Sequence, residues 1–127
     1  MSGKSTPKKI LIVEDDKDMQ EIYRDFFTSR KNNYTIDIEG KANAGLRRLT
    51  EQPYDLVILD IIMEPIPGDT FYACARSYNK TQNIPILVVS VLKAESLSNL
   101  KKINHVHFLQ KPITEDQLFA KIDAILS

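Results

Sequence analysis

The sequence predicts an α/β fold in which a parallel sheet is covered by helices on both faces. Five short apolar runs alternate along the chain with segments of helical period. Several of the runs are uninterrupted, for example at 10–13 and 86–89, as is typical of strands buried on both faces. Regular alternation of strands and helices favours right-handed crossovers, and therefore strands that run parallel.

The first half of the chain is predicted to form two strands and two helices. The β-branched run at 10–13 leads into a helix that Asp16 is expected to cap. That helix is predicted to bury an apolar stripe of Met19, Ile22, Phe26 and Tyr23. Residues 34–38 alternate with a period of two, which predicts a half-exposed strand near an edge. A helix over about 42–51 carries Leu46 and Leu49, and Pro53 ends it.

The second half is predicted to add three strands and three helices. The strands are expected at 56–59, at 86–89 and, as a shorter run, at about 106–109. One helix is expected around Phe71, Cys74 and Tyr78, and a weaker one over about 95–103. The last helix has the clearest start, because Thr114 and Gln117 have the spacing of a capping box. Its buried face is predicted to hold Leu118, Ile122 and Ile125.

The composition narrows the class of protein. A chain of 127 residues is the size of one domain, and we expect residues 1–7 to be a disordered tail and 8–127 to fold. Lysine plus arginine equals aspartate plus glutamate at 17 each, which argues against binding to nucleic acid or to a membrane surface. Cys74 is the only cysteine, which suits the reducing cytoplasm, and no apolar run is long enough to cross a membrane.

Polar residues gather just past the ends of four predicted strands. Glu14 and Asp15 follow the first strand, Asp60 the third, Ser90 the fourth and Lys111 the fifth. The carboxyl ends of parallel strands meet at one edge of the sheet, and ligands of open α/β sheets bind there. Residues that are far apart in the sequence are therefore expected to share one crevice.

The residue types at this edge indicate phosphoryl chemistry. The three carboxylates of Glu14, Asp15 and Asp60 would repel one another, and a hard divalent cation such as Mg²⁺ relieves that repulsion. Lys111 adds an ammonium group and Ser90 a hydroxyl group, and both can neutralise a transferring phosphoryl group. An aspartate can itself accept the phosphoryl group, and Asp60 is the best placed because it ends a central strand.

These segments resemble the receiver domains of bacterial two-component response regulators. The resemblance lies in Ile-Val-Glu14-Asp15-Asp16, in Leu-Val-Ile-Leu-Asp60, in the run that ends at Ser90, and in Phe108-Leu-Gln-Lys111-Pro112, and it covers about residues 8–126. It implies a flavodoxin-like (βα)5 three-layer sandwich, with a five-stranded parallel sheet in the order 2-1-3-4-5.

The resemblance also implies a role for each residue. Asp60 is expected to be the phosphoacceptor, and Mg²⁺ to bind Glu14, Asp15, Asp60 and the backbone carbonyl of Ile62. Ser90 and Phe108 are expected to be the switch residues. Lys111 is expected to pair with the phosphoryl group, and its peptide bond to Pro112 is expected to be cis. The implied partners are a sensor histidine kinase or histidine phosphotransfer domain, and an output domain or downstream protein. The resemblance implies a switching face made of the fourth helix, the fifth strand and the fifth helix. Homodimerisation through this face is an alternative that no residue favours.

Some positions depart from the receiver pattern. Val91 stands where receivers usually have a small residue. Glu64 stands where they usually have proline, and here the proline follows it at Pro65. These two departures leave the kinetics of phosphorylation open. Ile62 and Leu92 border the path of an attacking water, and neither can orient it, so we expect slow autodephosphorylation. The expected activity is therefore that of a signalling phosphoacceptor and not of a turnover enzyme.

Two other readings of the same residues remain. A phosphohydrolase of the haloacid dehalogenase type also uses an aspartate nucleophile, a lysine and Mg²⁺, but it needs a second acid two residues later, where Ile62 stands. A receiver-shaped interaction module that is never phosphorylated would not need the intact acidic residues, serine and lysine. Turnover of a generic phosphomonoester separates the enzyme from the receiver.

Overall fold

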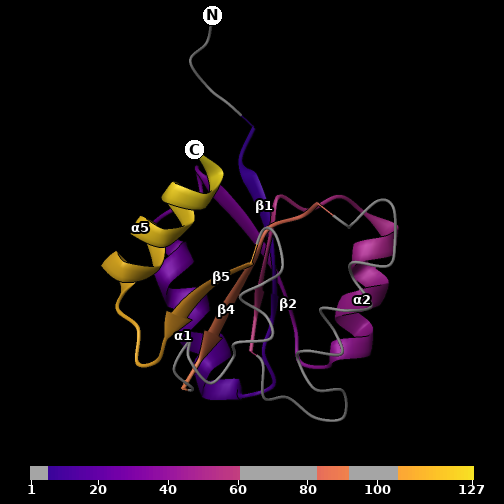
Figure 1. Ribbon diagram of the computed structural model, residues 1–127, viewed down its shortest axis with the longest axis horizontal. Coiled ribbons are helices and arrows are strands. Elements are labelled where there is room, and N and C mark those ends of the chain that lie inside the picture. Colours follow the sequence, from indigo (N-terminus) through magenta and orange to yellow (C-terminus); the bar gives the residue numbers. More distant parts are fainter. Residues whose placement is uncertain (1–5, 61–82, 92–105) are drawn as a thin grey trace, which may run out of the picture.

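The computed structural model describes residues 6–60, 83–91 and 106–127, and its five strands form one parallel sheet (Figure 1). The strand order is β2-β1-β3-β4-β5, which confirms the predicted flavodoxin-like arrangement. Every neighbouring pair of strands is parallel. The elements are β1 (Lys8–Val13), α1 (Lys17–Thr28), β2 (Tyr34–Glu39), α2 (Ala42–Glu51), β3 (Leu56–Leu59), β4 (Ile86–Ser90), β5 (Val106–Gln110) and α5 (Glu115–Leu126).

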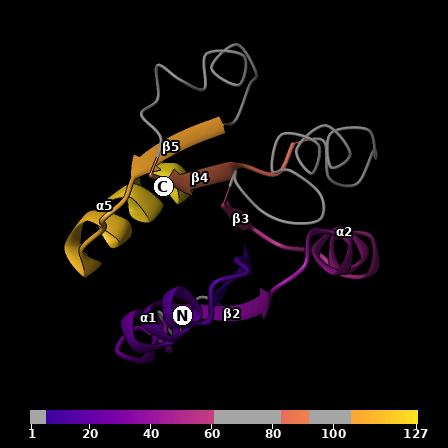
Figure 2. The same ribbon diagram turned by 90° about the horizontal axis from the view of Figure 1, so that it is seen from below.

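The sheet separates two apolar cores because successive side chains of a strand point to opposite faces. In β1, Leu11 and Val13 pack with α2, whereas Ile10 and Ile12 pack with α1 and α5. Figures 1 and 2 show the same division, with α2 on one side of the sheet and α1 and α5 on the other. All four residues of β3 and all five of β4 are buried, so the prediction of strands covered on both faces is confirmed.

Two helices begin where the sequence predicted. The side chain of Asp16 accepts a hydrogen bond of 3.0 Å from the backbone N–H of Asp18 at the start of α1. At the start of α5, Thr114 and Gln117 form the complete capping box. Both ends satisfy backbone N–H groups that have no partner within the helix.

The predicted buried stripe of α1 needs one correction. The helix buries Met19, Tyr23 and Phe27, which are spaced four residues apart, and Phe26 is partly buried beside them. Ile22 is 40% exposed. Because 3.6 residues make one turn, the stripe that contains Tyr23 and Phe27 turns Ile22 to the margin of the packed face. In α5, Phe119 joins the predicted Leu118 and Ile122 in the core, and Ile125 is partly buried.

Several predictions fall outside the described residues. These are the helix around Phe71, Cys74 and Tyr78, the helix over 95–103, the carbonyl of Ile62, and residues 1–5 of the predicted tail. Of the helices in the described ranges, none is both long and apolar enough to cross a membrane.

Candidate functional site

The backbone of the sheet carries the predicted site residues to one edge. Each of three residues donates its N–H to a neighbouring strand, as the next step of the hydrogen-bond ladder. Glu14 donates to the carbonyl of Glu39 at 2.9 Å, Asp60 to that of Val13 at 3.2 Å, and Lys111 to that of Ser90 at 2.8 Å. Their positions relative to one another are therefore set by the register of the strands, and the predicted convergence is confirmed for these residues.

Lys111 joins the ends of three strands through its side chain. Its Nζ lies 3.2 Å from Oε1 of Glu14 and 3.2 Å from Oδ2 of Asp60. The exposed fractions of the three side chains are only 18%, 2% and 12% respectively. Ion pairs in such a shielded position are screened less by water than surface pairs, so they constrain the geometry of the edge more strongly.

Three carboxylates at this edge form a cluster that fits a divalent cation. Oxygen atoms of Glu14, Asp15 and Asp60 all lie within 4.8 Å of one another, and Asp15 faces solvent. Opposite ligands of an octahedral Mg²⁺ ion stand about 4 Å apart, so a small movement or a bridging water closes this set around the ion. When all are ionised, the three carboxylates and the ammonium group of Lys111 have a net charge of −2, which one divalent cation would neutralise.

Burial and crowding of like charges perturb the ionisation of this cluster. Burial, and then repulsion by Asp60, raise the pKa of Glu14 to about 7 against the opposing attraction of Lys111. Burial by itself would lower the pKa of Lys111, but the attraction of Glu14 and Asp60 outweighs it, so the pKa of Lys111 is raised. Perturbed ionisable groups that share a cleft are characteristic of functional sites.

The remaining predicted residues lie on β4 and β5. Ser90 is 2% exposed at the end of β4, where it is in register with Gln110. Phe108 is partly buried in β5, in register with Val88, and packs against the core on the α2 face. The Lys111–Pro112 peptide bond is cis, as the resemblance predicted.

Two residues of α1 were not predicted from the sequence as neighbours of the cluster. Gln20 of α1 donates a hydrogen bond of 2.6 Å from Nε2 to the backbone carbonyl of Glu14. Tyr23 is 1% exposed, and burial, then the charges of Glu14 and Asp60, raise the pKa of its hydroxyl. The sequence carries no local signal for the Gln20 contact or for the effect of these charges on Tyr23, because both depend on how α1 packs on β1.

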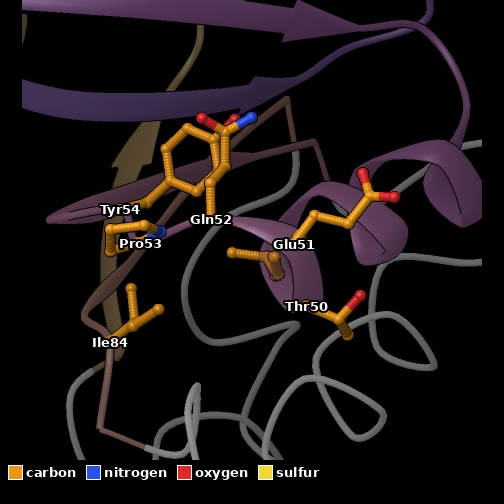
Figure 3. A pocket seen from close by; sticks show the side chains of 7 residues that line it. Thr50, Glu51, Gln52, Pro53, Tyr54 and Ile84 are labelled. Carbon is orange, nitrogen blue, oxygen red and sulfur yellow. The ribbon is translucent and has the colours of Figure 1, made fainter.

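A separate cavity lies at the opposite end of the sheet (Figure 3). It has a volume of about 360 Å³ and lies where α2 ends and where the chain leads into β3 and β4. Its described lining consists of Leu49, Thr50, Glu51, Gln52, Pro53, Tyr54 and Ile84. With Glu51 as the one carboxylate among these residues, it lacks the charge cluster that phosphoryl chemistry requires, so the candidate site is the edge that carries Asp60.

Known proteins resemble this chain over nearly its whole length. Response regulator ArlR of Staphylococcus epidermidis is 33% identical over 119 residues, which are 92% of this chain and 52% of that protein. Sensor histidine kinase TmoS of Ectopseudomonas mendocina is 30% identical over 124 residues, 97% of this chain and 12% of the kinase. The chain thus spans about half of ArlR and a small part of the kinase.

Solved structures share the fold at low sequence identity. Chemotaxis response regulator CheY4 of Vibrio cholerae has a TM-score of 0.87 and 20% identity, and the alignment covers 95% of this chain and 100% of that one. The receiver domain of sensor histidine kinase PA1611 from Pseudomonas aeruginosa, which has a magnesium ion coordinated in its active site cleft, has a TM-score of 0.79 and 19% identity over 95% of this chain and 98% of that one. The family model of the response regulator receiver domain matches residues 10–123, so this chain belongs to the receiver domains of two-component response regulators.

Proposed function

We propose that this receiver domain accepts a phosphoryl group on Asp60 with the help of a bound Mg²⁺ ion. The observation that carries the proposal is the bridge from Lys111 to both Asp60 and Glu14, at 3.2 Å each. It joins the acceptor, an acidic partner and a phosphate-pairing cation at the carboxyl edge of the sheet. Residues 8–127 are proposed to form this unit, in keeping with the start of β1 at Lys8.

The proposed reaction is a transfer from a phosphohistidine of a sensor kinase or a histidine phosphotransfer domain. A carboxylate oxygen of Asp60 forms a bond to phosphorus while the bond from phosphorus to the donor nitrogen breaks. The imidazole keeps the electron pair of that bond and takes a proton. Lys111 then exchanges its contact with the Asp60 carboxylate for a contact with a phosphoryl oxygen, and Ser90 supplies a hydroxyl donor to another.

Glu14, Asp15 and Asp60 would hold the metal, and the carbonyl of Ile62 is proposed as a further ligand. The bound ion would offset the negative charge that gathers on the phosphoryl oxygens. Contacts within the protein orient Glu14, since its Oε2 accepts a hydrogen bond of 3.2 Å from the N–H of Asp16 and its Oε1 contacts Lys111. A site arranged in advance needs little reorganisation during the transfer.

Incubation with acetyl phosphate and Mg²⁺, followed by intact mass measurement, tests the proposal. We expect the mass to increase by one phosphoryl group in the wild-type chain, and not in Asp60→Asn or without a divalent cation. Asp55→Asn is a matched control, because Asp55 lies at the other end of β3, before its first residue. A full mass increase in Asp60→Asn would refute Asp60 as the acceptor.

A generic phosphomonoester distinguishes the receiver from the phosphohydrolase. We expect no sustained hydrolysis of such a substrate, because a receiver has no group assigned to protonate its leaving alkoxide. Steady turnover that disappears in Asp60→Asn would favour the hydrolase instead. Family membership favours the receiver.

Phosphorylation is proposed to change the surface near β5. Ser90 and Lys111 would move toward the phosphoryl group, and Phe108 would turn toward the space that Ser90 leaves. Charge-assisted hydrogen bonds supply the free energy that favours one of two arrangements. The altered face, formed by the predicted helix at 95–103, β5 and α5, would contact an output domain or a downstream protein.

A further inference from the structure

The backbone of Glu14 is held from both sides. Its N–H donates to the carbonyl of Glu39 at the end of β2, at 2.9 Å. Its own carbonyl accepts a hydrogen bond of 2.6 Å from Nε2 of Gln20, one turn into α1. The first contact continues the sheet, whereas the second comes from a side chain and fixes the orientation of the peptide group between Glu14 and Asp15.

That orientation matters most for Asp15. Its carboxylate belongs to the acidic cluster, yet in the described part of the chain it makes no hydrogen bond or ion pair. Its neighbours, in contrast, are fixed: Glu14 by Lys111 and the N–H of Asp16, and Asp16 as the N-cap of α1. The backbone on either side is therefore what positions the Asp15 carboxylate, and Gln20 holds one of the two peptide groups.

Gly40 provides the space that this contact needs. A Cβ atom at position 40 would lie 3.3 Å from Nε2 of Gln20 and 3.8 Å from the carbonyl oxygen of Glu14. The first distance is tighter than ordinary van der Waals contact, so the Gln20 amide would have to shift by a few tenths of an ångström. The backbone of Gly40 does not adopt the left-handed conformation that favours glycine, so the contact with Gln20 is the reason that the structure gives for a small residue here.

We propose that Gln20 is a positioning residue of the acidic site, which fixes the Glu14–Asp15 peptide so that both carboxylates face one divalent cation, and that Gly40 leaves room for it. The inference rests on the proposed function. It extends the site to a side chain of α1 and to the end of β2, which belong to none of the four segments that carry the receiver resemblance. Residues that orient metal ligands change affinity by about 10- to 100-fold when they are removed.

Magnesium binding to Gln20→Met tests the role of the amide. Methionine is similar in length but cannot donate the hydrogen bond, so we expect the Kd for Mg²⁺, measured by calorimetry, to rise about 10-fold. The control is Gln117→Met, which removes another glutamine side chain that bonds to the backbone: its Oε1 accepts a hydrogen bond of 3.0 Å from the N–H of Thr114 in the capping box of α5. It should lower the urea midpoint without changing the Kd.

Phosphorylation by acetyl phosphate gives a second readout. If Gln20 positions the metal ligands, Gln20→Met should need about 10-fold more Mg²⁺ for half-maximal rate, yet reach the wild-type rate at saturating Mg²⁺. A lower maximal rate with an unchanged Mg²⁺ requirement would overturn the proposal, because it would assign Gln20 to a general structural role.

Substitution at Gly40 tests the same contact from the other side. Gly40→Ala should weaken Mg²⁺ binding in the wild-type chain and should have no further effect in a Gln20→Ala background, where the crowded amide is absent. An equal loss in both backgrounds would overturn the link between the two residues. The effect of Gly40→Ala in the wild-type chain also tests the proposal if Gln20→Met does not fold.

Measurements on the wild-type chain distinguish a failure of the proposed function from a failure of the role of Gln20. If it binds no Mg²⁺ and accepts no phosphoryl group, the proposed function fails. If it does both and Gln20→Met binds Mg²⁺ equally well, the proposed function stands and the role of Gln20 fails.

Discussion

Lys111 neutralises two carboxylates that separate strands bring to the same edge. Glu14 is 2% exposed as a side chain, so loss of the ammonium group would leave a buried acid without its cation. Buried charged groups that lose a partner cost more than the pair itself contributes, because the desolvation penalty remains. This single side chain is therefore expected to contribute to stability as well as to the proposed phosphoryl transfer.

Lys111→Met is expected to lower the free energy of unfolding by about 1–3 kcal/mol and to slow phosphorylation of Asp60. The measurement is urea denaturation at neutral pH in EDTA, with Lys17→Met as an exposed control on α1. Surface changes of the control type stay within about 0.5 kcal/mol. Equal stability of the two variants would contradict the bridging role of Lys111.

Asp15 is expected to decide whether Mg²⁺ stabilises the protein. A ligand that binds only the folded state at about 100 times its Kd adds about 2.7 kcal/mol to the free energy of unfolding. We expect this increase in the wild-type chain and in Asp18→Asn, whose carboxylate lies outside the cluster. Asp15→Asn should lose most of it, as measured by thermal denaturation with and without Mg²⁺.

Individual site residues differ in how far the sequence could predict them. Glu14, Asp60 and Lys111 could be predicted, because a parallel sheet forces the ends of its strands together and each residue follows an apolar run. Gln20 could not, since its partner is a backbone carbonyl, which has no sequence signature. The burial of Ile22 was predicted wrongly because two overlapping stripes on α1 are both apolar, and only packing against β1 selects between them.

At the level of elements, α5 is held against β2 and α1 by an aromatic cluster. The rings of Phe27 and Phe119 lie 5.0 Å apart, and those of Phe27 and Tyr34 lie 5.9 Å apart. The hydroxyl of Tyr34 donates a hydrogen bond to the carboxylate of Asp123, and the guanidinium of Arg30 lies over the ring of Phe119 at 4.2 Å. Contacts between elements distant in sequence thus fix the helix that follows the site loop.

The Tyr34–Asp123 contact should make stability depend on alkaline pH. Burial, and then the hydrogen bond to Asp123, raise the pKa of Tyr34 to about 12. A group whose pKa is raised on folding contributes stability that is complete below its unfolded pKa, about 10, and that is lost as the pH rises through 12. Tyr34→Phe should therefore be about 1 kcal/mol less stable at pH 7, with a difference that shrinks between pH 10 and 12. Urea denaturation across this range measures it, and a constant difference would contradict the assignment.

The start of α5 depends on local contacts that the sequence alone predicts. Thr114→Ala removes the side chain that accepts from the N–H of Gln117 at 3.1 Å, so we expect a loss of about 1 kcal/mol in the free energy of unfolding. Thr50→Ala is a suitable control, because Thr50 lies in the last turns of α2 and caps no N-terminus. If both variants lose the same stability, the capping box is not what fixes α5.

For the whole molecule, strand order was predictable only through the resemblance to receivers. Apolar runs locate the strands, but they do not say which strands are neighbours, and the order β2-β1-β3-β4-β5 places Asp60 between the acidic residues and the lysine. The edge position of β2 was indicated independently by its alternating pattern. In the structure the last four of its six residues, which follow Thr35, are partly buried. Periodicity therefore fixes local structure, and topology requires further information.

The ladder that runs into the site has a consequence for hydrogen exchange. The amide protons of Glu14, Asp60 and Lys111 are donated across the same interstrand ladder as those of the strand interiors. Solvent deuterium can reach them only when neighbouring strands part, so their protection factors should approach those of the central strands rather than those of loops. The backbone of the candidate site would then open only together with the sheet.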